Sequence, residues 1–125
     1  MALELNRPDS ERYLPFTIDD VSTADQQYIP VPARGYLKRV VTCLEGALTS
    51  ADATITIKKN GSTSLGTITV AYTSSAAGDV DTLEISPSAS SHFSEAGGDF
   101  VEVETDGGST GTQQLTGFLV FEDRG

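Results

Sequence analysis

Residues 53–72 read ATITIKKNGSTSLGTITVAY, the clearest secondary-structure signal in the chain. Ala53, Ile55 and Ile57 alternate with threonine and lysine, a period-two pattern typical of a strand with one buried face. Asn60-Gly61 follows at once and is a strong signal for a tight turn. A second alternating run then returns through residue 72. The sequence therefore predicts a β-hairpin over residues 53–72, with a loop of about 4–5 residues.

Short apolar runs of the same kind lie on both sides of this hairpin, separated by turn residues. They cover residues 13–18, 28–32, 36–44, 80–85, 100–105 and 115–121, with a further short strand around His92-Phe93. Within 36–44 the apolar parity changes, which predicts a β-bulge near Lys38-Arg39. No stretch has the period of an amphipathic helix. We therefore predict an all-β fold, an antiparallel, jelly-roll-like β-sandwich of about eight strands.

The start of the chain differs from the rest. Leu3 and Leu5 alternate with polar residues, and the run Asn6-Arg7-Pro8-Asp9-Ser10 then interrupts any regular structure. We predict an extended N-terminal arm over residues 1–12 and one β-sandwich domain over residues 13–125. A length of 125 residues suits a single domain.

The charge distribution limits the kinds of molecule that the protein is expected to bind. The formal net charge is −10, and residues 60–123 contain ten Asp or Glu but no Lys or Arg. Such a surface repels phosphate backbones and anionic membranes, so neither nucleic acid nor membrane is an expected partner. Solubility is the favoured interpretation of the acidic surface. Docking onto a basic partner is the alternative.

Cysteine usage and the first residues indicate where the protein is made. Cys43 is the only cysteine, so an internal disulfide is excluded, and it is expected to be a small buried residue. The first six residues lack the basic and apolar regions of a signal peptide. No apolar run approaches the roughly 20 residues of a membrane span. We expect synthesis in a cytoplasm without an export signal.

A search for catalytic chemistry yields no enzyme prediction. The single histidine, His92, lies in a serine-rich loop, and the sequence has no Gly-x-Ser-x-Gly nucleophile motif. One Cys and one His cannot complete a zinc site. Calcium has more potential ligands, namely Asp79, Asp81, Asp99, Glu102, Glu104 and Asp106, but these lack the spacing of an EF-hand loop. A non-enzymatic protein without metal or cofactor is expected.

Several stretches resemble small virion proteins of tailed bacteriophages. They are residues 28–46 (YIPVPARGYLKRVVTCLEG), 51–61 (ADATITIKKNG), 76–80 (AAGDV) and 98–103 (GDFVEV). The resemblance implies a jelly-roll module that decorates phage heads or occurs in fibres. It identifies the chain as similar to capsid decoration (cement) proteins, and implies the major capsid protein as partner, a homotrimer, and a place on the capsid surface of the virion.

An N-terminal arm suits such a role because a mobile segment can become ordered on binding and gain affinity without a large preformed surface. The candidate capsid-contact residues are Leu3, Leu5, Arg7, Tyr13 and Phe16. For Leu3 and Leu5 a disordered tail is the equally weighted alternative.

A different function remains open on the same fold. Jelly rolls also serve as carbohydrate- or receptor-binding modules of phage tails and fibres. The residues available to stack on sugars are Tyr13, Tyr28, Tyr36 and Tyr72, since the chain has no Trp.

Overall fold

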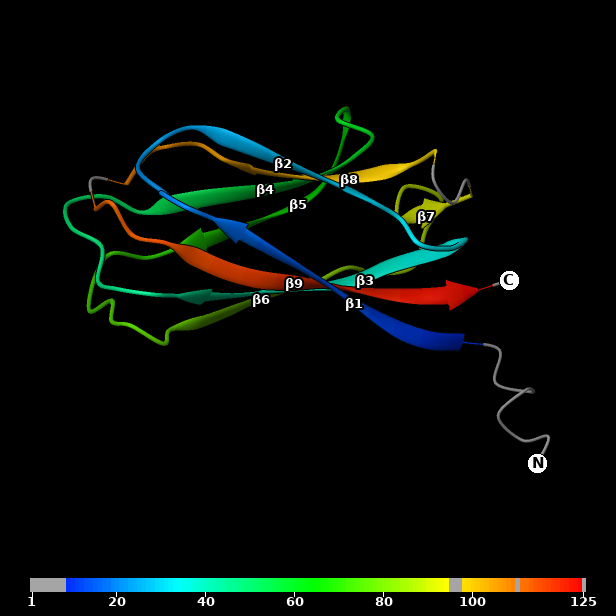
Figure 1. Cartoon of the computed structure of the whole chain (residues 1–125), viewed down its shortest axis with the longest axis horizontal. Helices are drawn as coiled ribbons and strands as arrows, with labels where there is room; N and C mark the ends of the chain where they lie inside the picture. The colour runs from blue at the N-terminus through cyan, green and yellow to red at the C-terminus, as the bar shows by residue number, and fades with distance from the viewer. Residues whose placement is uncertain (1–8, 95–97, 110, 125) are drawn as a thin grey trace.

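The computed structural model describes residues 9–94, 98–109 and 111–124, and contains no helix within them. Nine antiparallel strands form two facing sheets (Figure 1). The strands are β1 (Asp9–Ile18), β2 (Asp25–Pro30), β3 (Gly35–Leu44), β4 (Ala53–Lys59), β5 (Thr63–Val70), β6 (Val80–Glu84), β7 (His92–Phe93), β8 (Phe100–Thr105) and β9 (Leu115–Arg124). The predicted all-β sandwich is confirmed.

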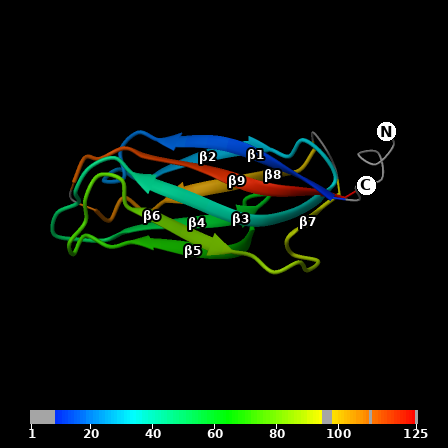
Figure 2. The same ribbon diagram turned by 90° about the horizontal axis from the view of Figure 1, so that it is seen from below.

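The strand order is that of a jelly roll. One sheet has the order β1-β9-β3-β6, with the two-residue β7 pairing to β3, and the other has the order β2-β8-β4-β5. Among the described strands, only β4 and β5 are both consecutive in sequence and paired, because most connections cross between the sheets (Figure 2). Without β7, eight strands make two four-stranded sheets, which matches the expected number.

The β4–β5 turn explains why the hairpin signal is so strong. Asn60 and Gly61 have φ values of 54° and 75°, and the amide of Ser62 donates to the carbonyl of Lys59 over 3.1 Å. Two central residues with positive φ give the turn that matches strand twist, and Asn-Gly adopts it with least strain. Lys59 pairs with Thr63, so the loop is shorter than predicted.

The predicted bulge in β3 is confirmed. The register between β3 and β9 shifts between Leu37 and Arg39. Leu37 and Val40 therefore both face the core although they are three residues apart, a spacing that would put them on opposite faces of a regular strand.

The core fills the space between the sheets with side chains of alternating positions. Its fully buried large members are Ile18, Leu37, Val40, Leu44, Ile55, Ile57, Val70, Phe93, Leu115, Leu119 and Phe121, with Val21 from the β1–β2 loop. Val101 and Val103 of β8 are also buried. The period-two pattern of Ala53, Ile55 and Ile57 correctly assigned the buried face of β4.

The first strand begins earlier than its apolar pattern indicated. β1 starts at Asp9 and pairs with β9 over ten positions, from Asp9 with Arg124 to Ile18 with Leu115. Residues 9–12 are therefore part of the sheet. Strand pairing along β9 places them there, although their side chains are polar. Of the arm predicted over residues 1–12, residues 1–8 lie outside the described residues.

Thr42 is a polar residue at a core position. Thr42 on β3 is fully buried, and its hydroxyl has no hydrogen-bond partner among the described residues. Because an unsatisfied buried hydroxyl costs free energy, Thr42→Val should raise the free energy of unfolding by about 1 kcal/mol. Urea denaturation would measure it, with Thr42→Ser as control, since serine keeps the hydroxyl and loses a methyl group. A Thr42→Val protein less stable than the parent would contradict this expectation.

Candidate functional site

The five candidate capsid-contact residues differ in where they lie. Leu3, Leu5 and Arg7 lie outside the described residues, whereas Tyr13 and Phe16 both lie on β1. Tyr13 is 59% exposed on the outer face of the five-stranded sheet. Phe16 is only 6% exposed and packs in the core. The expectation of a surface anchor at Phe16 is therefore corrected, because the two residues have opposite parity on one strand.

Tyr13 belongs to a small apolar surface that we call the outer patch, formed by Tyr13, Pro15 and Phe118. Pro15 pairs with Phe118 across the β1–β9 ladder, and Tyr13 is two residues along the same face. The rings of Tyr13 and Phe118 contact edge to face, with centroids 5.7 Å apart. Phe118 is 36% exposed. An exposed aromatic cluster on a charged protein is typical of an interaction surface.

Hydrogen bonding fixes the tyrosine of the outer patch. The Tyr13 hydroxyl donates to Glu11 over 2.8 Å, and this bond raises the pKa of Tyr13. Glu11 also accepts a hydrogen bond from the Lys38 ammonium, which is the main cause of the lowered pKa of Glu11. The Tyr13 ring is therefore held in place by a charged network before any partner binds.

Of the three outer-patch residues, Tyr13 alone was a contact candidate from the sequence, and Pro15 and Phe118 were not. Phe118 lies in a run, residues 115–121, that is apolar at both parities, so its face could not be assigned from alternation alone. Cys43, expected to be buried, is half-buried on this outer face, since it pairs with Thr116 and Val80.

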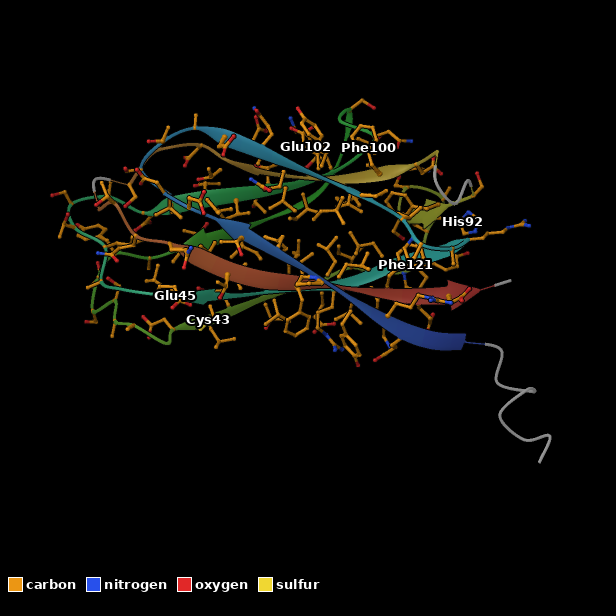
Figure 3. The ribbon with its side chains drawn as sticks, viewed as in Figure 1. Cys43, Glu45, His92, Phe100, Glu102 and Phe121 are labelled. Carbon is orange, nitrogen blue, oxygen red and sulfur yellow. The ribbon has the colours of Figure 1, made fainter. Side chains whose placement is uncertain are left out.

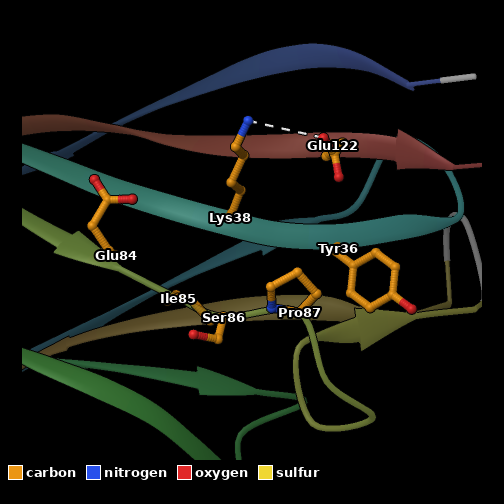
Figure 4. A pocket seen from close by; sticks show the side chains of 7 residues that line it. All are labelled: Tyr36, Lys38, Glu84, Ile85, Ser86, Pro87 and Glu122. Carbon is orange, nitrogen blue, oxygen red and sulfur yellow. Dashed lines mark ion pairs between the residues drawn. The ribbon is translucent and has the colours of Figure 1, made fainter. Parts of the chain in front are cut away.

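A hollow of about 380 Å³ lies on the same outer face of this sheet, beside the end of β6 (Figure 4). It is lined by Tyr36, Lys38, Glu84, Ile85, Ser86, Pro87 and Glu122. Lys38 also lies 3.9 Å from Glu122, and its hydrogen bond to Glu11 raises the pKa of Lys38. A lysine held protonated cannot act as a base or nucleophile at neutral pH. His92 contacts the Tyr36 ring edge to face at 4.8 Å.

The outer face of the four-stranded sheet carries a second aromatic cluster. Tyr28 of β2, 62% exposed, contacts Phe100 of β8 edge to face at 5.6 Å. Glu102 follows Phe100 along the outer face of β8 (Figure 3). It pairs with Tyr28 on one side and Lys58 on the other. Glu102 is only 6% exposed, which is unusual for a carboxylate on the outside of a sheet.

Most carboxylates considered for calcium serve local structure instead. Asp79 accepts from the amide of Ala76 at 2.9 Å, and Asp106 accepts from the amides of Gly108 and Thr54. Asp99 accepts from Ser94 and Asn60. Glu104 forms an ion pair with Lys58. Burial, with the charge of Asp79, raises the pKa of Asp81. No group of three or more Cys, His, Asp or Glu within the described ranges is placed to hold a metal ion.

The tyrosines proposed for sugar stacking lie apart. Tyr13 and Tyr28 are on the outer faces of different sheets, Tyr36 lines the hollow, and Tyr72 follows β5. Tyr28 is the one of the four that stands beside a half-buried Phe and a buried carboxylate.

Within the part of the chain that the structure describes, there is no helix long and apolar enough to cross a membrane.

Comparisons with known proteins give a structural similarity alone. No protein-family model and no curated protein sequence matches the chain. Among solved structures, the chain is similar to the virus-like particle of extra small virus from the giant freshwater prawn Macrobrachium rosenbergii. The TM-score is 0.41 and the sequence identity 10%, with 94% of this chain and 80% of the other chain covered. At this distance the similarity does not bear on function.

Proposed function

We propose that the protein is a non-enzymatic structural component of a virion, a decoration (cement) protein that binds the outer surface of a phage head and stabilises it. The observation that carries this proposal is the outer patch of Tyr13, Pro15 and Phe118, an exposed apolar cluster on a rigid sheet. The phage assignment is supported by the sequence resemblance of residues 28–46, 51–61, 76–80 and 98–103.

The outer patch suits attachment to a large surface better than capture of a small molecule. It is an open surface of three apolar side chains at the β1 edge of the sheet, and β1 directly follows residues 1–8. Leu3 and Leu5 would extend the apolar contact along the major capsid protein. A homotrimer would present three such surfaces at once, which raises avidity without new contacts.

The proposed contact surface can be tested with purified phage heads that lack the protein. Tyr13→Ser combined with Phe118→Ser should weaken binding to purified heads by at least roughly 30-fold, the effect of removing one aromatic hot spot worth about 2 kcal/mol. Co-sedimentation with heads would measure the affinity. Tyr72→Ser, an exposed tyrosine outside the patch, is the matched control. A deletion of residues 1–8, which leaves β1 intact, should also weaken binding.

Unchanged binding by the double variant, with its fold verified by circular dichroism, would overturn the proposed contact surface. Binding to tail fibres or to cells, but not to heads, would favour the alternative of a carbohydrate- or receptor-binding module of a tail. A glycan array distinguishes these outcomes, because a head decoration protein is expected to bind no glycan.

A further inference from the structure

Glu102 is a buried carboxylate on the outside of the sandwich. It is 6% exposed on β8, the second strand of the four-stranded sheet, between Tyr28 of β2 and Lys58 of β4. No hydrogen bond joins its carboxylate to another residue in the described part of the chain, and the carboxylate oxygens keep some contact with solvent, since Thr42 alone has a fully buried side-chain oxygen without a partner there. A carboxylate with no donor inside the protein and an accessible edge is open to a cation from outside.

The nearby donors are committed elsewhere. The Lys58 ammonium pairs with Glu104 at 3.0 Å, and Gln26 also donates to Glu104, at 3.3 Å. The amide nitrogen of the Asn60 side chain donates to Asp99 at 3.0 Å. Glu102 therefore receives only the more distant attraction of Lys58.

The β4–β5 turn closes over one side of Glu102. A Cβ on Gly61 would lie 3.2 Å from Oε1 of Glu102 and 3.8 Å from the Phe100 ring. The absence of a side chain at Gly61 thus allows the turn to approach the carboxylate. The same arrangement shields Glu102 from bulk water, which strengthens its interaction with any charge that enters.

Two aromatic rings lie next to Glu102. The Tyr28–Phe100 pair stands beside Glu102 on the same face, and Figure 3 shows Phe100 and Glu102 projecting from β8 away from the other sheet. Aromatic faces attract cations, and most strongly guanidinium groups, which also stack on rings. A carboxylate with two free oxygens accepts the paired N–H groups of guanidinium.

The overall charge favours a cation over a neutral sugar. The chain has eight Lys or Arg and a net charge of −10. Arg12, Lys38, Arg39 and Lys58 already form ion pairs. A sugar hydroxyl would leave the charge of Glu102 in place, whereas a cation neutralises it.

We propose that Tyr28, Phe100 and Glu102 form a receptor for one arginine side chain of a partner protein. The guanidinium would lie against the aromatic pair and bind the Glu102 carboxylate through two N–H groups. This site is on the opposite sheet from the outer patch, so the proposal does not depend on the function proposed above.

A tripeptide titration tests the site on the full chain. The probe is acetyl-Gly-Arg-Gly-amide, and the comparison peptide carries citrulline, which has the shape of arginine without its charge. In two-dimensional ¹H–¹⁵N NMR spectra, the arginine peptide should give saturable shifts of the amides of Gly61, Phe100 and Glu102. The expected dissociation constant is on the order of 1–10 mM, as suits so small a ligand.

Glu102→Gln should weaken binding of the arginine peptide at least roughly tenfold, because the charge-assisted pair is lost. Tyr28→Ala should weaken binding as well, and because Tyr28 is 62% exposed, the variant should keep its fold. The control is Glu84→Gln, which removes the same charge from the other sheet and should leave binding unchanged.

Three outcomes would overturn the proposal. They are equal shifts with the citrulline peptide, arginine binding that survives in Glu102→Gln, and equal weakening in Glu84→Gln, which would indicate a general attraction to the acidic surface. Shifts of the same amides by neutral glucose, without shifts by the arginine peptide, would assign the aromatic pair to sugar binding instead.

Discussion

Replacing Phe121 with alanine is expected to lower the free energy of unfolding by about 3–5 kcal/mol. Phe121 is fully buried on β9, pairs with Leu37 of β3, and contacts Phe93 edge to face at 5.9 Å. Alanine would remove the ring from the core, leave a cavity beside Phe93, and lose the ring–ring contact. Urea denaturation followed by circular dichroism would measure the change.

The same strand supplies a matched control. Phe118→Ala makes the same substitution three residues away, on the outer face, where the ring is 36% exposed. Its cost should be clearly smaller than that of Phe121→Ala, because Phe118 is already partly exposed and its removal leaves no enclosed cavity. Equal costs for the two variants would mean that β9 does not present Phe121 inward and Phe118 outward, and the strand register would have to be revised.

Gly117→Ala is expected to destabilise the protein by about 1–3 kcal/mol, although alanine otherwise suits ordered structure better than glycine. A Cβ on Gly117 would lie 2.5 Å from the carbonyl oxygen of Val41 and 2.7 Å from the Phe16 ring. The first of these atoms belongs to the backbone of the paired strand β3, so it cannot move without disturbing the ladder. Thermal unfolding would show the effect as a lower midpoint.

Gly78→Ala provides the comparison that separates crowding from backbone strain. Gly78 has a φ of +93°, yet a Cβ there would meet nothing within 4 Å. The loss of stability in Gly78→Ala should therefore come from backbone conformation alone. Gly117 is not among the glycines with positive φ, so its cost should come from contacts alone. A neutral Gly117→Ala variant would show that β1, β9 and β3 can separate slightly without loss of stability.

Much of the fold was predictable because alternation and turn chemistry are local properties. The Asn60-Gly61 turn and the inward positions of Ile55, Ile57, Val101 and Val103 depend on residues close in sequence. The bulge in β3 was also visible, since it changes the parity of the apolar residues within one strand. Longer-range pairing could not be obtained in this way.

The candidate sites depend on that pairing. The outer patch exists because β1 and β9 align Pro15 with Phe118, and the arginine receptor exists because β2, β8 and β4 align Tyr28, Glu102 and Lys58. Glu102 and Glu104 share one face of β8, as their spacing of two residues requires. The structure places Lys58 against Glu104, so the two carboxylates have different surroundings.

The pairing of the first and last strands has a mechanical consequence. Because β1 and β9 are antiparallel, Asp9 and Arg124 lie side by side. A force that pulls these two residues apart would load the hydrogen bonds of the ladder one pair at a time and unzip β1. A force along β1, between Asp9 and the opposite end of the sheet, would load all ten residue pairs in shear. The sheet should therefore resist a force applied along its strands far better than a force that separates Asp9 from Arg124.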